Sequence, residues 1–366
     1  MSPPWVGSRR WLTLLTARPP VILPWASACR RRGVDPIAST IRRPSPPRSA
    51  MTASPLQRWI GLSLELGKAR LSALVVVTTL AGYLMAARPL PGWGHLLATL
   101  LGTALCAFGA NGFNQVLERD RDALMVRTRE RPLPAGRVGV RAAAVWSGAV
   151  VLAGAGLLLA LVNAAAAALA LGTVLLYVLV YTPLKPRSTL NTLAGAICGA
   201  IPPLIGWSAV TGGVFGGDQG GGWWLALLLF VWQVPHFLSL AWLYRDDYRR
   251  AGFKMLPLQD PRGDRTFRFL MLYAWVLLPL GLLATFMGLT GAVFAVGSLL
   301  LGGAWLWLGV RCYRDRSSLN ARRVFLGSVV YLPLVLGLMV ADRAPPRAEP
   351  AEAAAVAVDT PLSGSV

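Results

Sequence analysis

Three polar residues stand at regular spacing near the end of a long apolar segment. Asn114, Glu118 and Asp122 are each four residues apart. At about 100° per residue this spacing predicts a stripe on one face of a helix, about 12 Å long. One amide and two carboxylates are hard oxygen ligands, which Mg²⁺ accepts together with phosphate oxygens and water. The alternative is that the acids pair with Arg119 and Arg121 at a solvated helix end. We call Asn114, Glu118 and Asp122 the polar stripe.

A cationic segment follows the polar stripe directly. Residues 125–137, here named the arginine loop, are interrupted by Pro and Gly and contain four arginines, Arg127, Arg129, Arg131 and Arg137. The charge of a diphosphate must be met by both a metal ion and guanidinium groups. Metal-binding acids beside an arginine-rich loop therefore indicate a site for a diphosphate.

Two more cations, Lys185 and Arg187, follow a different apolar segment. They would join the same site if the two segments end at the same membrane surface. The alternative is topological, because Lys and Arg in short loops also set the orientation of a membrane protein.

A second group of reactive residues lies near the end of a later apolar segment. His236 stands within that segment, and Asp247 and Lys254 follow it. A histidine inside a membrane span is costly unless it has a partner or a water-lined cavity. If the helix continues, His236 and Asp247 share a face, since 11 residues make about three turns. The alternative for His236 is a hydrogen bond between helices.

The elements that must position these residues are membrane spans. Of the 366 residues, 55% are hydrophobic and only 14% are charged, and the mean hydropathy is +0.53. These values exclude an ordinary soluble protein. The four cysteines are scattered without a CxxC motif, which supports neither a zinc site nor covalently attached haem. The net charge of +20 lies in the N-terminal segment and in alternate loops, so its placement indicates a lipid bilayer and no nucleic acid.

About nine apolar segments are long enough to span a bilayer. We expect the first to extend back through Leu62–Leu66, and the fifth to kink or break at Pro202 and Pro203. The predicted spans are Leu71–Ala86, His95–Gln115, Ala142–Val162, Ala165–Tyr181, Leu190–Val210, Trp223–Leu243, Phe269–Met287, Gly291–Val310 and Val324–Val340.

The loops between these spans predict the orientation. Those after spans two, four, six and eight contain 21 Lys and Arg residues, whereas those after spans one, three, five and seven contain only Arg88. The positive-inside rule then places the first group and the N-terminus in the cytoplasm, or in the matrix of a mitochondrion. We predict a multi-pass protein of the bacterial inner membrane, with the mitochondrial inner membrane as the alternative.

The two ends of the chain differ from the body, residues 51–341. Residues 1–50 contain nine arginines and a single acid, Asp35. They are interpreted as a disordered extension, with a transit segment or a start codon at Met51 as further interpretations. Residues 342–366 are rich in Pro, Ala and Glu and are predicted to be a disordered tail.

All the candidate groups fall at one membrane surface. The polar stripe, His236 with Asp247, and the basic loops lie at the same ends of their spans, and the opposite surface has nothing comparable. We therefore predict an all-α polytopic membrane protein, one bundle around a cavity open to the cytoplasmic side. Such a cavity would bind an anion through metal and cations and an apolar tail along its walls, as a prenyl diphosphate requires.

At these residues the chain resembles the UbiA-type intramembrane prenyltransferases, and within them the haem branch, the protohaem IX farnesyltransferases. The resemblance covers about residues 68–340. Its signatures are Asn114-Gln-x-x-Glu118-x-x-x-Asp122, Arg127-Thr-x-x-Arg131-Pro-Leu, Tyr181-Thr-Pro-Leu-Lys185, Gly199-Ala-Ile-Pro-Pro-Leu-Ile-Gly-Trp207, Trp232-Gln-x-Pro-His236-Phe and Asp247-Tyr-x-x-Ala-Gly-Phe-x-Met-Leu-Pro257. The chain departs from the general pattern in two ways: the middle acid of the stripe is Glu118, and the second aspartate-rich motif is reduced to Asp247 with Asp246.

The resemblance implies a role for each matched residue. Mg²⁺ with diphosphate would be bound by Asn114, Glu118 and Asp122, and Asp247 would hold a second metal or orient Lys254. His236 would face the haem, as an iron ligand or a general base. The cations that would clamp the diphosphate are Arg127, Arg131, Lys185, Arg187 and Lys254.

The implied reaction is transfer of farnesyl from farnesyl diphosphate to a vinyl group of haem b, with addition of water. Trp232, Phe237 and Tyr248 are candidates for stabilising the allylic cation. The resemblance makes haem A synthase or oxidase assembly factors candidate protein partners. Two alternatives stay open, a prenyltransferase acting on an aromatic quinone precursor and a multi-span transporter.

Overall fold

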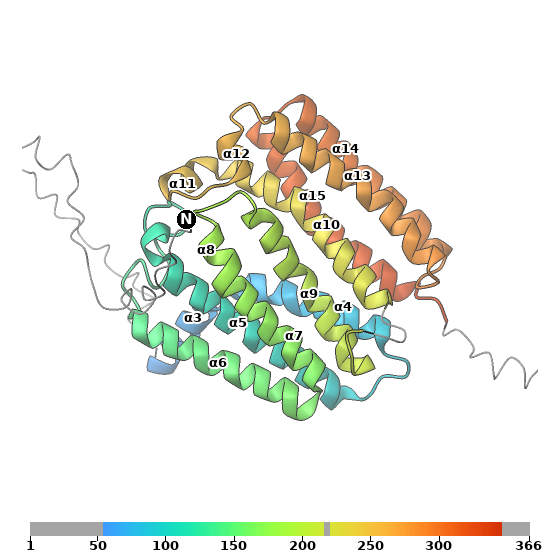
Figure 1. The fold of residues 1–366 in the computed structure, drawn as a ribbon, viewed down its shortest axis with the longest axis horizontal. Coiled ribbons are helices and arrows are strands. Elements are labelled where there is room, and N and C mark those ends of the chain that lie inside the picture. The colour runs from blue at the N-terminus through green and yellow to red at the C-terminus, as the bar shows by residue number, and fades with distance from the viewer. Residues whose placement is uncertain (1–53, 216–219, 346–366) are drawn as a thin grey trace, which may run out of the picture. The chain divides into compact units, whose positions relative to one another are not determined.

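The computed structural model describes residues 54–215 and 220–345, which form helices joined by short loops (Figure 1). Nine helical segments in this part are long and apolar enough to span a membrane. This confirms the predicted fold class, with α7, η2 and α8 together forming the fourth span. The helices are α3 (Pro55–Leu66), α4 (Ala69–Ala86), α5 (Trp93–Asp122), α6 (Val140–Leu161), α7 (Ala164–Leu175), η2 (Leu176–Tyr181), α8 (Thr182–Leu184), α9 (Asn191–Thr211), α10 (Gly220–Leu243), α11 (Arg245–Arg250), α12 (Leu256–Gln259), α13 (Asp264–Phe286), α14 (Ala292–Arg314) and α15 (Ser318–Ala341).

The spans pack in two groups that meet at α9 and α10. In the first group α5 packs on α6, and α4 packs on both α5 and α9. In the second group α10 packs on α13 and α15, and α14 packs on α13 and α15. Contacts of α9 with α10 and of α4 with α15 join the groups. α4, α9, α10 and α15 therefore enclose the middle of the bundle.

Small residues let α4 and α9 approach each other closely. A Cβ atom added at Gly206 of α9 would overlap the carbonyl oxygen of Thr79 and lie 2.7 Å from the amide nitrogen of Tyr83. One added at Gly82 of α4 would overlap the carbonyl oxygen of Pro203. Close contact between backbones through small residues is a main source of helix association in membranes. This crossing holds one wall of the bundle together.

We expect Gly206→Ala to lower the free energy of unfolding by about 1–3 kcal/mol, because the backbone of α4 must move away. The matched control is Gly156→Ala on α6, where the added methyl group would meet nothing within 4 Å. Thermal unfolding in detergent measures the stability of both variants. Equal stability of the two variants would show that the α4–α9 distance is not set by Gly206.

Of three local expectations two are wrong, and of the kink or break expected in the fifth span the break does not occur. The first span does not extend back through Leu62–Leu66, because Lys68 has φ 48° and separates α3 from α4. The fifth span does not break, since α9 continues through Pro202 and Pro203. The sixth span ends at Leu243, and Asp247 belongs to the separate helix α11. The continuous helix on which His236 and Asp247 would share a face is therefore absent.

The predictions for residues 1–50 and for most of the C-terminal tail lie outside the described residues. The first four residues of that tail are placed against the loop before α14. The Asp342 carboxylate accepts a hydrogen bond from the Phe294 amide, 2.6 Å away, and the Ala344 amide donates to the Leu289 carbonyl, 3.0 Å away. The end of α15 is thus attached to the start of α14.

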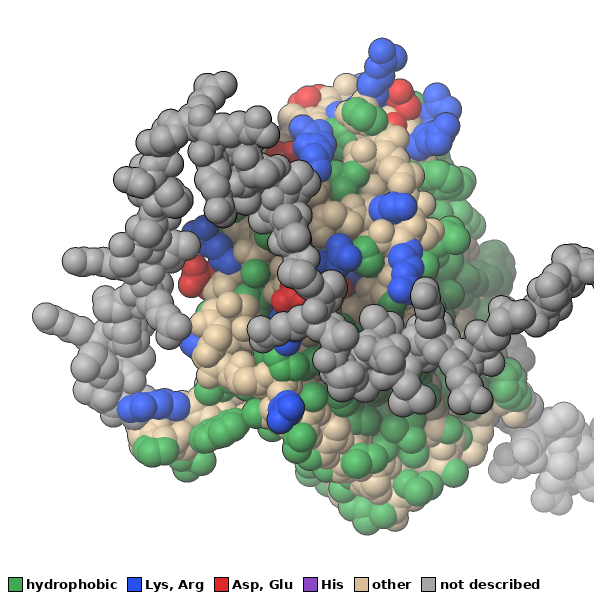
Figure 2. Space-filling model, turned by 60° about the vertical axis from the view of Figure 1, so that its left-hand side comes forward, with side chains coloured by type: hydrophobic (Ala, Val, Ile, Leu, Met, Phe, Trp, Pro, Cys, Tyr) green, Lys and Arg blue, Asp and Glu red, His purple; other side chains and the backbone are tan. Residues whose placement is uncertain are grey.

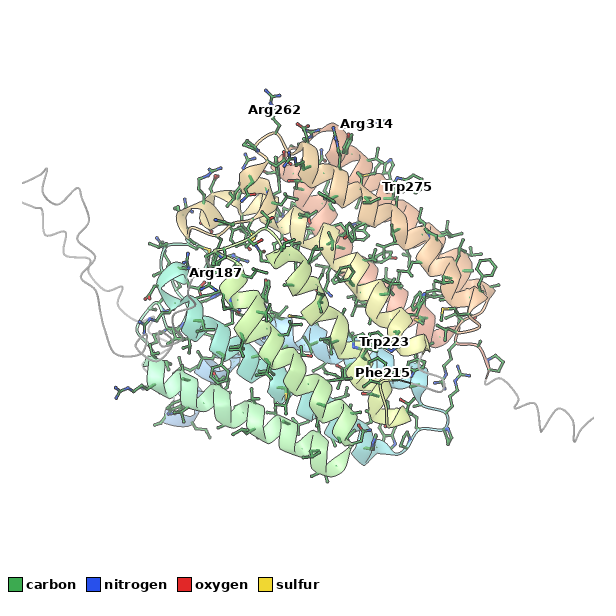
Figure 3. All side chains as sticks on the ribbon, viewed as in Figure 1. Arg187, Phe215, Trp223, Arg262, Trp275 and Arg314 are labelled. Carbon is green, nitrogen blue, oxygen red and sulfur yellow. The ribbon has the colours of Figure 1, made fainter. Side chains whose placement is uncertain are left out.

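The basic loops meet at one end of the bundle, named here the basic end (residues 123–139, 185–190, 244–263 and 315–317). Backbone and side-chain hydrogen bonds join these loops: the Lys254 amide donates to the Lys185 carbonyl at 2.8 Å, and Arg121 donates to the Ala251 carbonyl at 2.9 Å. Figure 2 shows basic side chains spread over the face on this side. Figure 3 shows Arg187 and Arg262 here, and Phe215 and Trp223 toward the opposite end.

Candidate active site at the basic end of the bundle

The polar stripe forms as the spacing predicts. α5 continues to Asp122, and all three stripe side chains are buried, with at most 5% of each residue exposed. The alternative pairing with neighbouring arginines does not occur. Arg119 contacts Asp120, and Arg121 reaches the Ala251 carbonyl. The stripe therefore faces the inside of the protein at the basic end.

Each residue of the polar stripe contacts one cation from another segment. Lys68 Nζ donates to Asn114 Oδ1 at 2.6 Å. Lys185 Nζ lies 2.8 Å from Glu118 Oε1, and Arg131 Nη1 lies 2.7 Å from Asp122 Oδ2. The three cations come from the α3–α4 junction, the end of the fourth span and the arginine loop. The fold thus brings alternating oxygen ligands and cations into one cluster.

The amide of Asn114 is held in one orientation. Asn114 Nδ2 donates to Thr182 Oγ1 at 3.0 Å, and the Thr182 hydroxyl donates to the Tyr177 carbonyl at 2.8 Å. A hydroxyl that has donated its single proton can only accept from Asn114. The Asn114 oxygen therefore points toward Lys68 and the site. The π-helical segment η2 supplies the Tyr177 carbonyl, and such segments are frequent at functional sites.

The pKa values of the two half-buried lysines shift in opposite directions. Burial lowers the pKa of Lys68 to about 7, and the charges of Arg131 and Lys185 act in the same direction. Burial alone would also lower the pKa of Lys185, but the Glu118 carboxylate outweighs it and raises the pKa of Lys185 above its ordinary value. The Glu118 carboxylate therefore favours the charged form of Lys185, and an anion bound beside Lys68 would raise the pKa of Lys68 in the same way.

The donor set of the stripe fits a hard divalent metal that shares its ligands with a substrate. Asp122 Oδ1 is buried and has no hydrogen-bond partner. Within residues 54–215 and 220–345, no three His, Cys, Asp or Glu side chains gather closely enough to hold a metal. Two carboxylates and one amide leave coordination positions for phosphate oxygens and water, as Mg²⁺ prefers.

Asp247 anchors the arginine loop. Its two carboxylate oxygens accept from the amides of Val126 (3.2 Å) and Arg127 (3.4 Å), and Arg250 pairs with it. Partial burial alone would raise the pKa of Asp247, but Arg250 and the two amides outweigh it and hold the pKa below its ordinary value. The contacts thus support a role in placing the loop, and metal binding by Asp247 stays a prediction.

We expect Asp247→Ala to weaken binding of inorganic diphosphate by about 10- to 100-fold, because two hydrogen bonds to a charged acceptor are lost. Hydrogen exchange at residues 125–131 should rise at the same time. The matched control is Asp246→Ala, whose side chain is 68% exposed and pairs with Arg249 at the surface. Unchanged exchange in the loop of Asp247→Ala would contradict the anchoring role.

The remaining predicted cations lie at the rim. The Arg127 guanidinium carbon lies 4.6 Å from the centroid of the Tyr244 ring and 5.9 Å from that of Tyr248. Arg187 and Lys254 are exposed, and Lys254 contributes its backbone, which bonds to Lys185 and Asn191. The structure brings Arg131 and Lys185 into the stripe but not these three.

An apolar cavity of about 210 Å³ begins next to the stripe and lies between α4, α5, α7, α9, α10 and α15. Tyr181 lines it and contacts Lys185, whose Nζ is 4.6 Å from the ring centroid. Asn111, one helical turn before Asn114, also lines it and accepts from the Tyr177 hydroxyl at 3.3 Å. The cavity therefore adjoins both the anionic ligands and the cations.

His236 lines the same cavity, although it is more than 100 residues from the polar stripe in the sequence. Trp232 and Phe237 line the cavity beside it, whereas Tyr248, the third aromatic candidate, packs on Arg127 and Phe253. The hydrogen bond between helices that was the alternative for His236 is present, since Nδ1 lies 2.7 Å from Ser328 Oγ on α15. The histidine thus has a partner and also faces the cavity.

Sequence reasoning missed three residues of this site. Lys68 precedes the first span, Thr182 lies inside the Tyr181–Lys185 signature, where no role was expected for it, and Ser328 is one serine among many. The sequence offers one signal for Lys68, a cation placed directly before the start of a span. Nothing in the order of residues connects Ser328 with His236, which are 92 positions apart.

Comparison with known proteins gives the family and the fold of the chain. Residues 75–334 match the UbiA prenyltransferase family. The chain is 40% identical over 289 residues to a protohaem IX farnesyltransferase of Solibacter usitatus, covering 76% of this chain and 98% of the relative. It is 41% identical over 283 residues to the mitochondrial protohaem IX farnesyltransferase of Arabidopsis thaliana, covering 76% and 64%. A solved structure of a UbiA homologue from Archaeoglobus fulgidus, bound to GPP and Mg²⁺, has the same fold, with a TM-score of 0.55, 17% identity and coverage of 76% and 99%.

Proposed function

The chain belongs to the UbiA prenyltransferase family, and we propose that it transfers the farnesyl group of farnesyl diphosphate to a vinyl group of haem b (protohaem IX). Water adds to the same vinyl group, which gives haem O and diphosphate for the biogenesis of haem-copper oxidases. One observation carries this function: the polar stripe with its three cations adjoins an apolar cavity that also holds His236. Relatives at 40% identity over most of the chain have this activity in their names.

Mg²⁺ is the metal proposed for the polar stripe. Asn114 Oδ1, the Glu118 carboxylate and the unpartnered Asp122 Oδ1 would hold it. When bound, it would neutralise charge on the departing diphosphate. A homologue of known structure binds Mg²⁺ and a prenyl diphosphate, which supports this choice of metal.

The protein's own cations complete the diphosphate site. Arg131, Lys185 and Lys68 all lie against stripe oxygens. Once those oxygens have a metal as partner, the three cations can donate to phosphate oxygens without moving far. They would bind the substrate and stabilise the charge that develops on diphosphate as the carbon–oxygen bond breaks.

The cavity provides for the apolar part of the reaction. The vinyl carbon of the acceptor attacks the allylic carbon of farnesyl as diphosphate leaves, and water then captures the resulting cation and releases a proton. Trp232 and Phe237 line the cavity, where each ring could stabilise a cation by about 0.5–2 kcal/mol. Tyr181, next to Lys185, is a better placed third candidate than Tyr248.

Two other functions are less well supported. An aromatic quinone precursor as acceptor gives no use to His236 in the cavity. A transporter needs access from both membrane surfaces, whereas the described cations and acids that contact the stripe all lie at the basic end. The products of the reaction distinguish these alternatives.

The protein is a multi-pass membrane protein, and we propose that its basic end and its N-terminus face the cytoplasm of a bacterium. The excess of Lys and Arg in alternate loops supports this orientation. The mitochondrial inner membrane is the alternative location, because one relative is a mitochondrial protein. Haem A synthase and oxidase assembly factors are proposed as protein partners, because they would consume the product.

The test of this function is production of a new haem. The full chain and residues 51–366 are expressed in bacteria that lack their own haem O synthase, and the extracted haems are weighed by mass spectrometry. We expect a haem heavier than haem b by one farnesyl group plus water. If haem b alone is found despite well-inserted protein, the proposed acceptor is wrong, and aromatic-ring acceptors are tested next.

A further inference from the structure

His236 and Ser328 form a contact between α10 and α15 in the middle of the bundle. His236 Nδ1 lies 2.7 Å from Ser328 Oγ. Ser328 is fully buried, while His236 lines the apolar cavity. The histidine therefore has a buried partner on α15 and also borders the space that a substrate would occupy.

The proton on this hydrogen bond can be assigned from a second contact. Ser328 Oγ also lies 2.6 Å from the carbonyl oxygen of Phe325, which can only accept. A serine hydroxyl has one proton, so it must donate to Phe325 and accept from His236. The neutral histidine then carries its proton on Nδ1 and a lone pair on Nε2.

The ring of His236 is also fixed in its plane. It stacks on Trp232 with centroids 5.0 Å apart and lies against Phe325 at 4.9 Å. The Trp232 indole donates to the Ser328 carbonyl at 3.1 Å, so the same residue of α15 holds both rings. No group in residues 54–215 or 220–345 forms a hydrogen bond with Nε2.

We propose that Ser328 is a positioning residue, which fixes His236 as the Nδ1–H tautomer and so presents the Nε2 lone pair to the iron of the haem substrate. Neutral imidazole is a common metal ligand, and the partner of the second ring nitrogen sets which nitrogen binds. This inference rests on the proposed function, because it takes haem b to be the occupant of the cavity.

The surroundings favour an iron ligand over a general base. The rings of Trp232, Phe237 and Phe325 surround the imidazole, and no carboxylate contacts it within the described residues. A base would become a cation in this apolar setting without a counter-charge, which is costly. A ligand to iron stays neutral.

The test is titration of the purified full chain with ferric haem b, followed by its absorption spectrum and electron paramagnetic resonance. The wild type is expected to show an imidazole-ligated iron, and His236→Ala to lose this signal. Ser328→Ala should weaken haem binding by about 10- to 100-fold, as loss of the residue that orients a histidine ligand commonly does. Binding of farnesyl diphosphate should not change.

Matched variants separate orientation from folding. Ser298 on α14 is also buried and also donates to the carbonyl three residues before it, but contacts no histidine, so Ser298→Ala should bind haem as the wild type does. If Ser328→Ala does not fold, Ser328→Thr and Ser328→Val are compared with each other. The two side chains are alike in shape, and only Thr keeps the hydroxyl that would orient His236. Thr is expected to retain the imidazole signal and Val to lose it.

Two results would overturn the inference. One is an unchanged haem affinity and spectrum in Ser328→Ala or Ser328→Val. The other is a wild type that makes haem O in cells but shows no imidazole on the iron. The second result leaves the proposed function intact, whereas a wild type that makes no haem O contradicts that function itself.

Discussion

Asp122→Asn is expected to abolish turnover while the protein stays folded and inserted. Asp122 is completely buried, and only one of its two oxygens is engaged, by Arg131. Asparagine keeps the shape and can still accept from Arg131, but it removes the negative charge that a metal requires. We expect a loss of about 10³-fold or more, since metal-assisted charge stabilisation contributes several kcal/mol and about 1.4 kcal/mol is tenfold.

The matched control for this prediction is Asp120→Asn. Asp120 lies two residues away on α5, but its side chain is 87% exposed and contacts Arg119 at the surface. Steady-state rates at rising Mg²⁺ concentration should show normal activity for Asp120→Asn and none for Asp122→Asn. Unchanged turnover in Asp122→Asn would remove the metal assignment from the polar stripe.

Lys185→Met should have the second largest effect, on both stability and activity. Lys185 is only 12% exposed and pairs with the buried Glu118. Breaking a buried pair by removing one partner costs about 3–5 kcal/mol, because an uncompensated charge stays inside. The diphosphate site also loses one of its three cations, so binding of farnesyl diphosphate should fall with the stability.

A double variant separates these two effects. Glu118→Gln with Lys185→Met leaves no unpaired charge at this contact, so thermal stability should recover, yet activity should stay low because both groups belong to the site. Arg187→Met is expected to cost less than Lys185→Met, since Arg187 is exposed at the rim. Equal losses for Arg187 and Lys185, or recovery of activity in the double variant, would contradict the assignment of Lys185.

The sequence alone predicted the membrane fold and the candidate groups that the structure gathers at the basic end. Apolar runs of about 20 residues reveal spans because length and composition decide whether a helix crosses a bilayer. The four-residue spacing of Asn114, Glu118 and Asp122 predicted one buried face, because helical periodicity is a local property. Alternation of charge between loops predicted which candidate groups lie at one surface, and the structure joins those loops by hydrogen bonds.

Where a helix is interrupted was harder to predict. The residues before the first span include leucines that continue its apolar pattern, and the left-handed backbone at Lys68 separates α3 from α4. At this break the Gly67 carbonyl accepts hydrogen bonds from the side chains of Ser72 and Asn111. The Lys68 side chain donates a hydrogen bond to Asn114. Such an interruption is stabilised by partners from other helices, so local propensity does not reveal it.

Only the tertiary structure decided which partner each site residue has. Lys68 reaches Asn114, Asp247 reaches the amides of the arginine loop, and Ser328 reaches His236, over separations of 46, 121 and 92 residues. The family resemblance implied that Asp247 holds a second metal or orients Lys254, and the structure shows its carboxylate on the amides of the arginine loop. Contacts between distant residues depend on how closely helices cross, as at Gly82 and Gly206. Composition and periodicity determine the helices, and packing between helices determines the chemistry of the site.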